Sequence, residues 1–136
     1  MKRLTAEWVT KAEADHRAVT WLARMKPPIH DVVCCHARLC AEKYLKGLLQ
    51  QSGCPVPKTP DLDELLSLVL PSHPTLRSLR RGLLFLTRFA VGTYYPGREG
   101  GKREAAAALR WANRVRTTAR ELLGIRPPRP RPTKSG

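Results

Sequence analysis

The stretch CCHARLCAEKYLKGLLQQSG, residues 34–53, decides the fold of this chain. At 100° per residue, the helix predicted over residues 31–51 carries one apolar stripe, made of Val33, Ala37, Cys40, Ala41, Tyr44 and Leu48. A second apolar group lies on the opposite side, among Glu42 and Lys46, and consists of Cys35, Leu39 and Leu49. A helix that is apolar on two sides is either central in its bundle or shared with a partner subunit.

The rest of the chain is helical in pattern as well. Ala, Leu and Arg dominate, and no segment alternates apolar and polar residues as a half-buried strand does. Clusters of proline and glycine separate four further helices, which we predict over residues 5–25, 61–70, 75–91 and 102–123. The sequence therefore predicts an all-α domain over residues 1–124, with Gly124 as the final helix cap. It also predicts a disordered basic tail, IRPPRPRPTKSG, over residues 125–136.

The chain is strongly basic, with 25 Lys and Arg against 11 Asp and Glu and a formal net charge of +14. This charge favours a polyanionic partner, first of all nucleic acid or nucleotide, although a genome rich in Arg and Pro would produce a basic surface without one. No apolar run approaches the ~18 residues of a membrane span, so we expect a cytoplasmic protein that does not bind membranes. The four cysteines are not spaced like a disulfide framework.

One carboxylate falls in an apolar face. On the first helix, Leu4, Trp8, Ala12 and Val19 share one side, and Asp15 lies in the middle of it. A carboxylate in that position must be paired or hydrogen-bonded, because an unpaired buried charge costs several kcal/mol. Asp15 therefore belongs either to a structural ion pair or to the edge of a site.

Two groups of charged residues follow helical spacings. Arg77, Arg81 and Arg88 form a stripe along the helix predicted over residues 75–91, which is either a phosphate track or a solvated face. Glu42 and Lys46 stand four residues apart in the favourable order, and the simplest interpretation of this pair is a surface i,i+4 contact.

The sequence predicts no metal site. Cys35, His36 and Cys40 lie on one helix, but there is no CxxC and no second ligand pair at zinc spacing. Cysteines on a packed helix are usually small core residues. The chain also contains no P-loop and no GxSxG motif.

Three motifs of the chain resemble those of HEPN domains. Residues 34–53 resemble the family's signature helix, which commonly reads HxxQxAEKxLKxxL. TPDLDELL at residues 59–66 resembles THDLxxLL, and AVGTYYPG at residues 90–97 resembles AVxxRYPG. The match covers about residues 7–124. It implies an up-and-down bundle of four main helices plus one short helix, often dimeric, that binds nucleotide or RNA. It also implies pairing with a minimal nucleotidyltransferase, as a toxin–antitoxin or regulatory module.

Many members of the family are metal-independent RNases with an Arg-x4–6-His motif near the start of the last helix. In this chain Arg88 is followed by FAVGTYYPGREGGK, which contains no histidine. Pro60 stands where the family usually has His, and Tyr94 where it usually has Arg. We therefore assign no catalytic residue and no cofactor, and predict a module that is not an enzyme.

Our leading hypothesis is a non-catalytic module with a basic groove. Phosphate would meet Lys43 and Lys46 and be clamped by Arg81 and Arg88, while Tyr94 or Tyr95 would stack on a base. Three supporting residues complete the set: Asp15, His36 and Glu42. The alternatives are a metal-independent RNase toxin and a structural adaptor with no nucleic-acid role. The two apolar sides of the second helix, together with Phe85, which faces away from its own core stripe, favour a homodimer.

Overall fold

The structure is a computed structural model that describes residues 1–90 and 101–126, and all regular secondary structure in these ranges is helical. Its elements are α1 (Arg3–Leu22), α2 (His30–Gln51), α3 (Leu62–Val69), the 3-10 helix η1 (Pro74–Leu79), α4 (Arg80–Leu86), the 3-10 helix η2 (Thr87–Phe89) and α5 (Lys102–Leu122). The predicted all-α class is confirmed. None of the described helices is long and apolar enough to cross a bilayer.

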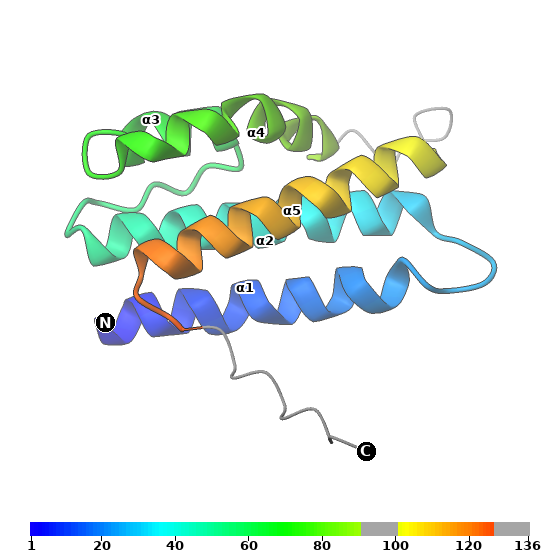
Figure 1. The fold of residues 1–136 in the computed structure, drawn as a ribbon, viewed down its shortest axis with the longest axis horizontal. Coiled ribbons are helices and arrows are strands. Elements are labelled where there is room, and N and C mark those ends of the chain that lie inside the picture. The colour runs from blue at the N-terminus through cyan, green and yellow to red at the C-terminus, as the bar shows by residue number, and fades with distance from the viewer. Residues whose placement is uncertain (91–100, 127–136) are drawn as a thin grey trace, which may run out of the picture.

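Helix α2 occupies the middle of the bundle. In Figure 1, α1 runs along one side of α2, α3 and α4 lie on the other side, and α5 crosses it. Most residues of both apolar groups of α2 are buried, Ala37 and Tyr44 on one side and Cys35 and Leu49 on the other, while Leu39 is half-buried. The central position of α2 within a single chain therefore accounts for most of the two-sided pattern.

The segment over residues 74–89 differs from the single helix that we predicted over residues 75–91. It begins as η1, continues as α4 and ends as η2. Leu76, Leu79, Leu83 and Leu86 are all buried along this segment, at spacings of three, four and three residues. The segment therefore buries one row of leucines although it is not a single α-helix.

Gly82 allows α4 to approach α5 closely. A Cβ atom built at Gly82 would lie 2.0 Å from Cε3 of Trp111, so the indole ring occupies the space of the missing side chain. The guanidinium carbon of Arg114 lies 4.6 Å from the centroid of the same ring. The contact between Gly82 and Trp111 holds the last helix against the α4 segment.

The buried face of α1 overlaps the predicted face only in part. Its buried residues are Thr5, Val9, Ala12, Asp15 and Val19. Leu4 is 43% exposed, and Trp8 is only half-buried, so the prediction for these two residues is wrong. Helices α1 and α2 approach closely at Gly47, where an added Cβ would lie 3.3 Å from Cβ of Trp8.

Two helix ends are capped, and one of these caps, Gly124, was predicted. The carboxylate of Asp61 accepts hydrogen bonds from the backbone N–H groups of Asp63 (3.0 Å) and Glu64 (3.4 Å) at the start of α3. After α5, Gly124 adopts φ +73°, and the N–H of Ile125 donates to the carbonyl of Arg120 at 2.9 Å. Gly124 therefore ends the helix as predicted.

Candidate functional site

Asp15 joins two residues that the sequence analysis had singled out. Its Oδ1 lies 2.8 Å from Nδ1 of His36, and its Oδ2 accepts a hydrogen bond from the ammonium group of Lys43. The Asp15 side chain is only 8% exposed. His36 and Lys43 are seven residues apart, two turns of α2, and therefore face α1 together. The prediction that Asp15 must be paired is confirmed.

Glu42 and Lys46 form a second and separate cluster. Glu42 accepts from Arg38 at 2.7 Å and from Lys46 at 3.1 Å. The Lys46 side chain is 9% exposed, and its ammonium group lies 5.7 Å from the centroid of the Trp8 ring. The pair is thus present but largely buried, with Lys46 buried and Glu42 half-buried, which corrects the interpretation of a surface contact. Lys46 and Lys43 bind different carboxylates, and the sequence analysis missed Arg38 although it stands four residues before Glu42.

Glu13 is the centre of a third cluster, which ties α1, α2 and α5 together. Its Oε1 accepts hydrogen bonds from Nε of Arg116 (2.9 Å), from Nη1 of Arg120 (2.7 Å) and from the hydroxyl of Tyr44. Burial raises the pKa of Glu13, but the hydrogen bonds from Arg116 and Tyr44 and the charges of both arginines outweigh it. The net pKa therefore lies below its usual value near 4.5. Burial likewise raises the pKa of the Tyr44 hydroxyl, and Glu13 raises it further.

A hollow of about 430 Å³ opens between the end of the α4 segment and the start of α5. We call it the arginine hollow; its charged and aromatic lining consists of Phe85, Arg88, Arg103, Glu104 and Arg110, and two alanines of α5 complete it. Three positive charges and one carboxylate therefore surround the space. The carboxylate of Glu104 accepts from the backbone N–H of Gly101 at 3.0 Å, which caps α5.

Aromatic rings hold one side of the arginine hollow. The guanidinium carbon of Arg88 lies 5.6 Å from the centroid of Phe85 and 5.9 Å from that of Phe89. The two rings contact each other edge to face, with centroids 5.2 Å apart. Phe85, which we had expected to face a partner subunit, therefore packs within its own chain.

The predicted phosphate-binding residues are distributed over several places. Arg88 lines the arginine hollow, whereas Arg81 is exposed on α4 and is not part of the lining. Lys43 lies in the Asp15 cluster, and Tyr94 and Tyr95 lie outside the described residues. The sequence analysis missed Arg103 and Arg110 as a pair, although their spacing of seven residues, with alanines between them, was a usable signal.

Within the described ranges, no group of three or more His, Cys, Asp or Glu residues could hold a metal ion. Cys34, Cys35 and Cys40 are buried thiols, as expected for core residues of a packed helix. Desolvation raises the pKa of Cys34 to about 11 and that of Cys40 to about 12, so neither sulfur is a ready nucleophile.

The fold and the arginine hollow define a small helical-bundle domain with a basic surface site where the last helix begins. The family model of the HEPN domain matches residues 5–122, and the chain belongs to this family. Two solved structures share the fold. The archaeal HEPN homologue ST0689 is 23% identical, with a TM-score of 0.73, and the match covers 90% of this chain and 99% of that one. The protein TT1696 from Thermus thermophilus is 23% identical, with a TM-score of 0.75, and the match covers 89% and 98%. No curated protein sequence matches the chain.

Proposed function

We propose that this chain is a nucleotide- or RNA-binding HEPN module whose phosphate-binding site is the arginine hollow. The observation that carries the proposal is the convergence of Arg88, Arg103 and Arg110 from two elements around one space. Guanidinium groups present paired N–H donors that match phosphate oxygens, and several of them around one hollow can bind successive phosphates. The formal charge of +14 would attract a polyanion over a longer range.

The arrangement of the histidines supports a binding role without catalysis. Cleavage of RNA needs a group that accepts the proton of the 2′-hydroxyl, close to the groups that stabilise the phosphate. No histidine is among the described residues that line the arginine hollow. His36, the substitute base that we considered, is hydrogen-bonded to Asp15 between α1 and α2. The RNase hypothesis therefore remains the alternative, and the assay below tests it.

We also propose a minimal nucleotidyltransferase as the partner of this chain, in a toxin–antitoxin or regulatory pair. This partner is inferred from the family resemblance. The homodimer also rests on the family resemblance. The two apolar sides of α2 no longer argue for a partner subunit, because α2 lies in the centre of its own bundle. Light scattering at tens of micromolar protein tests the dimer. The alternative is a structural adaptor with no nucleic-acid role. The RNA-binding titration excludes this alternative if the chain binds RNA and supports it if the chain does not.

The experiment is a fluorescence anisotropy titration with a labelled single-stranded RNA and, in competition, ATP. The variant R103A/R110A should weaken RNA binding by about tenfold for each lost charged contact, since these contacts are worth ~1.5 kcal/mol or more. The matched control is R3A/R17A, which removes two exposed arginines of α1 and should change affinity only slightly. Equal losses in the two variants would mean that binding follows net charge alone and would contradict the hollow as the site. Deletion of residues 127–136 should leave most of the affinity intact.

A second assay separates binding from cleavage. The full chain, incubated with tRNA or mRNA without metal between pH 6 and 8, should leave the RNA intact. Cleavage that disappears in R88A but persists in H36A would restore the RNase alternative, with Arg88 as its phosphate-stabilising group.

A further inference from the structure

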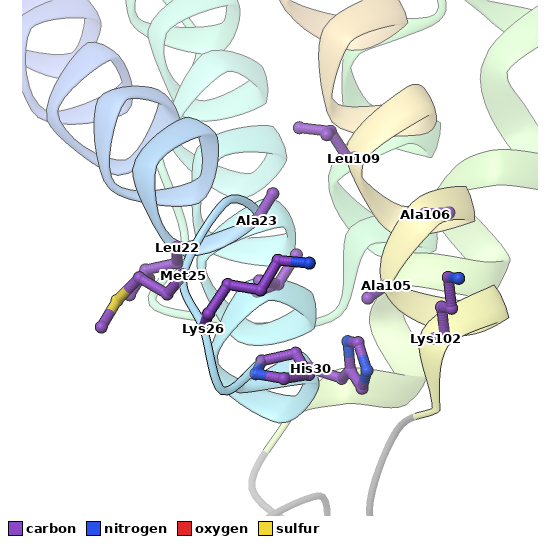
Figure 2. Close-up of a pocket in the computed structure, with 11 residues that line it drawn as sticks. Leu22, Ala23, Met25, Lys26, His30, Lys102, Ala105, Ala106 and Leu109 are labelled. Carbon is purple, nitrogen blue, oxygen red and sulfur yellow. The ribbon is translucent and has the colours of Figure 1, made fainter.

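A second hollow lies on the other flank of α5, at the end of the bundle where α1 leads into α2. We call it the end pocket; it has a volume of about 380 Å³ and is lined by residues from the end of α1, the α1–α2 connection, the start of α2 and the start of α5. Figure 2 shows Lys26 and His30 on the side of the connection and Lys102 on the side of α5. Of its lining residues, only Ala106 also lines the arginine hollow, so the two spaces are distinct.

The floor of the end pocket is apolar and continuous with the core. Val33 is buried, and Leu22 and Leu109 are partly buried side chains that pack against the core cluster. These three side chains come from α1, α2 and α5, which hold the floor in place from three directions. An apolar concavity of this size, with a few convergent polar groups, has the form of a small-molecule site.

Among the described residues, the ionisable groups that line the end pocket are all basic. They are Lys26, His30 and Lys102, and this part of the lining contains no carboxylate. Asp31 is the nearest acidic residue along α2, and it is not among the lining residues. Neither lysine forms an ion pair with any residue in the described ranges. Helix α5 begins at Lys102, so its first turn lies on the same side of the pocket.

From this combination we propose that the end pocket binds a small organic anion with an apolar body, such as a medium-chain or aromatic carboxylate. The apolar body lies against Leu22, Val33 and Leu109, and the anionic head meets Lys26 and Lys102 at the rim. An inorganic anion would satisfy the lysines but leave the floor in contact with water, whereas an uncharged apolar molecule would leave the lysines without a role. This site is independent of the RNA-binding proposal, because the arginine hollow contributes no charged residue to it.

The test uses the fluorescent sulfonate 1-anilinonaphthalene-8-sulfonate as a probe and octanoate as its competitor, with the full-length folded chain. We expect saturable binding of the probe that octanoate displaces and that inorganic phosphate displaces far less well. The variant K26A/K102A should weaken probe binding by about tenfold, as expected for a lost charged contact. The control variant K2A/K58A, which removes two lysines elsewhere, should bind the probe like the parent chain.

Unchanged binding in K26A/K102A, or equal displacement by phosphate and octanoate, would overturn the proposal. Amide chemical shifts of the parent chain give a check that needs no variant. Octanoate should shift the amide signals of Leu22, Val33 and Leu109 and leave those around Arg88 and Arg110 in place. Shifts centred on the arginine hollow, or spread evenly over the chain, would likewise overturn it.

Discussion

Basic residues occur in two regions of the molecule, the side of the bundle that faces α1 and the arginine hollow. The two regions differ in the number of carboxylates close to the basic groups. On the α1 side, each of three carboxylates forms ion pairs with two basic side chains. Glu13 pairs with Arg116 and Arg120, and Asp15 pairs with His36 and Lys43. Glu42 pairs with Arg38 and Lys46. In the arginine hollow, three arginines share the space with Glu104, which also caps a backbone N–H. The Glu13 and Asp15 clusters therefore link different helices and the Glu42 pairs lie within α2, whereas the three arginines of the hollow line a space at the surface.

The difference teaches that a high net charge does not locate a binding site. In the sequence, Lys43 and Lys46 are positively charged residues on a helix, as Arg103 and Arg110 are. In the structure, however, both lysines form ion pairs with carboxylates of their own chain. What locates the candidate site is the distribution of the few acidic side chains. Removing charge from the first region should therefore lower stability, and removing it from the second should lower affinity.

The largest effect is expected for D15A. This change leaves Lys43 and His36 partly buried without their shared acceptor, and loss of one partner of a buried ion pair costs several kcal/mol. Because both partners keep some solvent access, we expect the free energy of unfolding in urea to fall by about 2–3 kcal/mol, with RNA affinity unchanged. D15N is the control and should lose less, since its amide oxygen still accepts one hydrogen bond. A loss of affinity without a loss of stability would reverse our assignment of the two regions.

The next largest effect is expected for G82A, which tests the framework of the arginine hollow. The added methyl group would overlap the indole ring of Trp111, so α4 and α5 must separate. Overpacking of this kind costs about 1–3 kcal/mol, which thermal or urea unfolding measures. L84A changes an exposed side chain of the same helix and should stay within about 0.5 kcal/mol of the parent chain. Equal stability of G82A and the parent would mean that the contact between α4 and α5 is looser than the structure describes.

The Glu13 cluster gives a pH-dependent prediction. The pKa of Glu13 is lower in the folded state than its usual value, so its contribution to stability is complete above pH 4.5 and is lost as the pH falls through the lowered pKa. E13Q should therefore destabilise the chain by about 1–2 kcal/mol at pH 7 and by much less at pH 3. Urea unfolding at both pH values measures this. E7Q, at an exposed position, controls for the lost charge. If the free energies of unfolding of E13Q and the parent chain differed by the same amount at pH 7 and at pH 3, the lowered pKa of Glu13 would be contradicted.

The smallest effect on stability is expected for R110A. Arg110 is exposed, so the free energy of unfolding should change by less than about 0.5 kcal/mol. If the hollow binds phosphate, RNA affinity should fall by about tenfold, and the salt dependence of log K should lose about one unit of slope. R114A serves as the comparison, because this arginine stacks on Trp111 outside the hollow. An unchanged salt slope in R110A would remove Arg110 from the site.

The sequence alone determined the helical class, the two buried sides of α2 and the need for a partner of Asp15. Each of these follows from a local rule: apolar residues repeat at 3.6-residue spacing on both sides of α2, and a carboxylate within an apolar face requires a partner. The short helix at residues 62–69 and the end of α5 at Gly124 also follow from local capping signals.

Only the tertiary structure decided which charges meet. Asp15 lies 28 residues from Lys43, and Glu13 lies 107 residues from Arg120. Arg88 lines the same hollow as Arg110 although they stand on different helices. On α1, Ala12, Asp15 and Val19 are buried as predicted, whereas Leu4 is exposed and Val9 is buried instead. Helices α1 and α2 approach closely at Gly47, and α4 and α5 approach closely at Gly82. The periodicity of a sequence indicates which face of a helix is apolar. The residues that this face contacts depend on how the helices pack against one another.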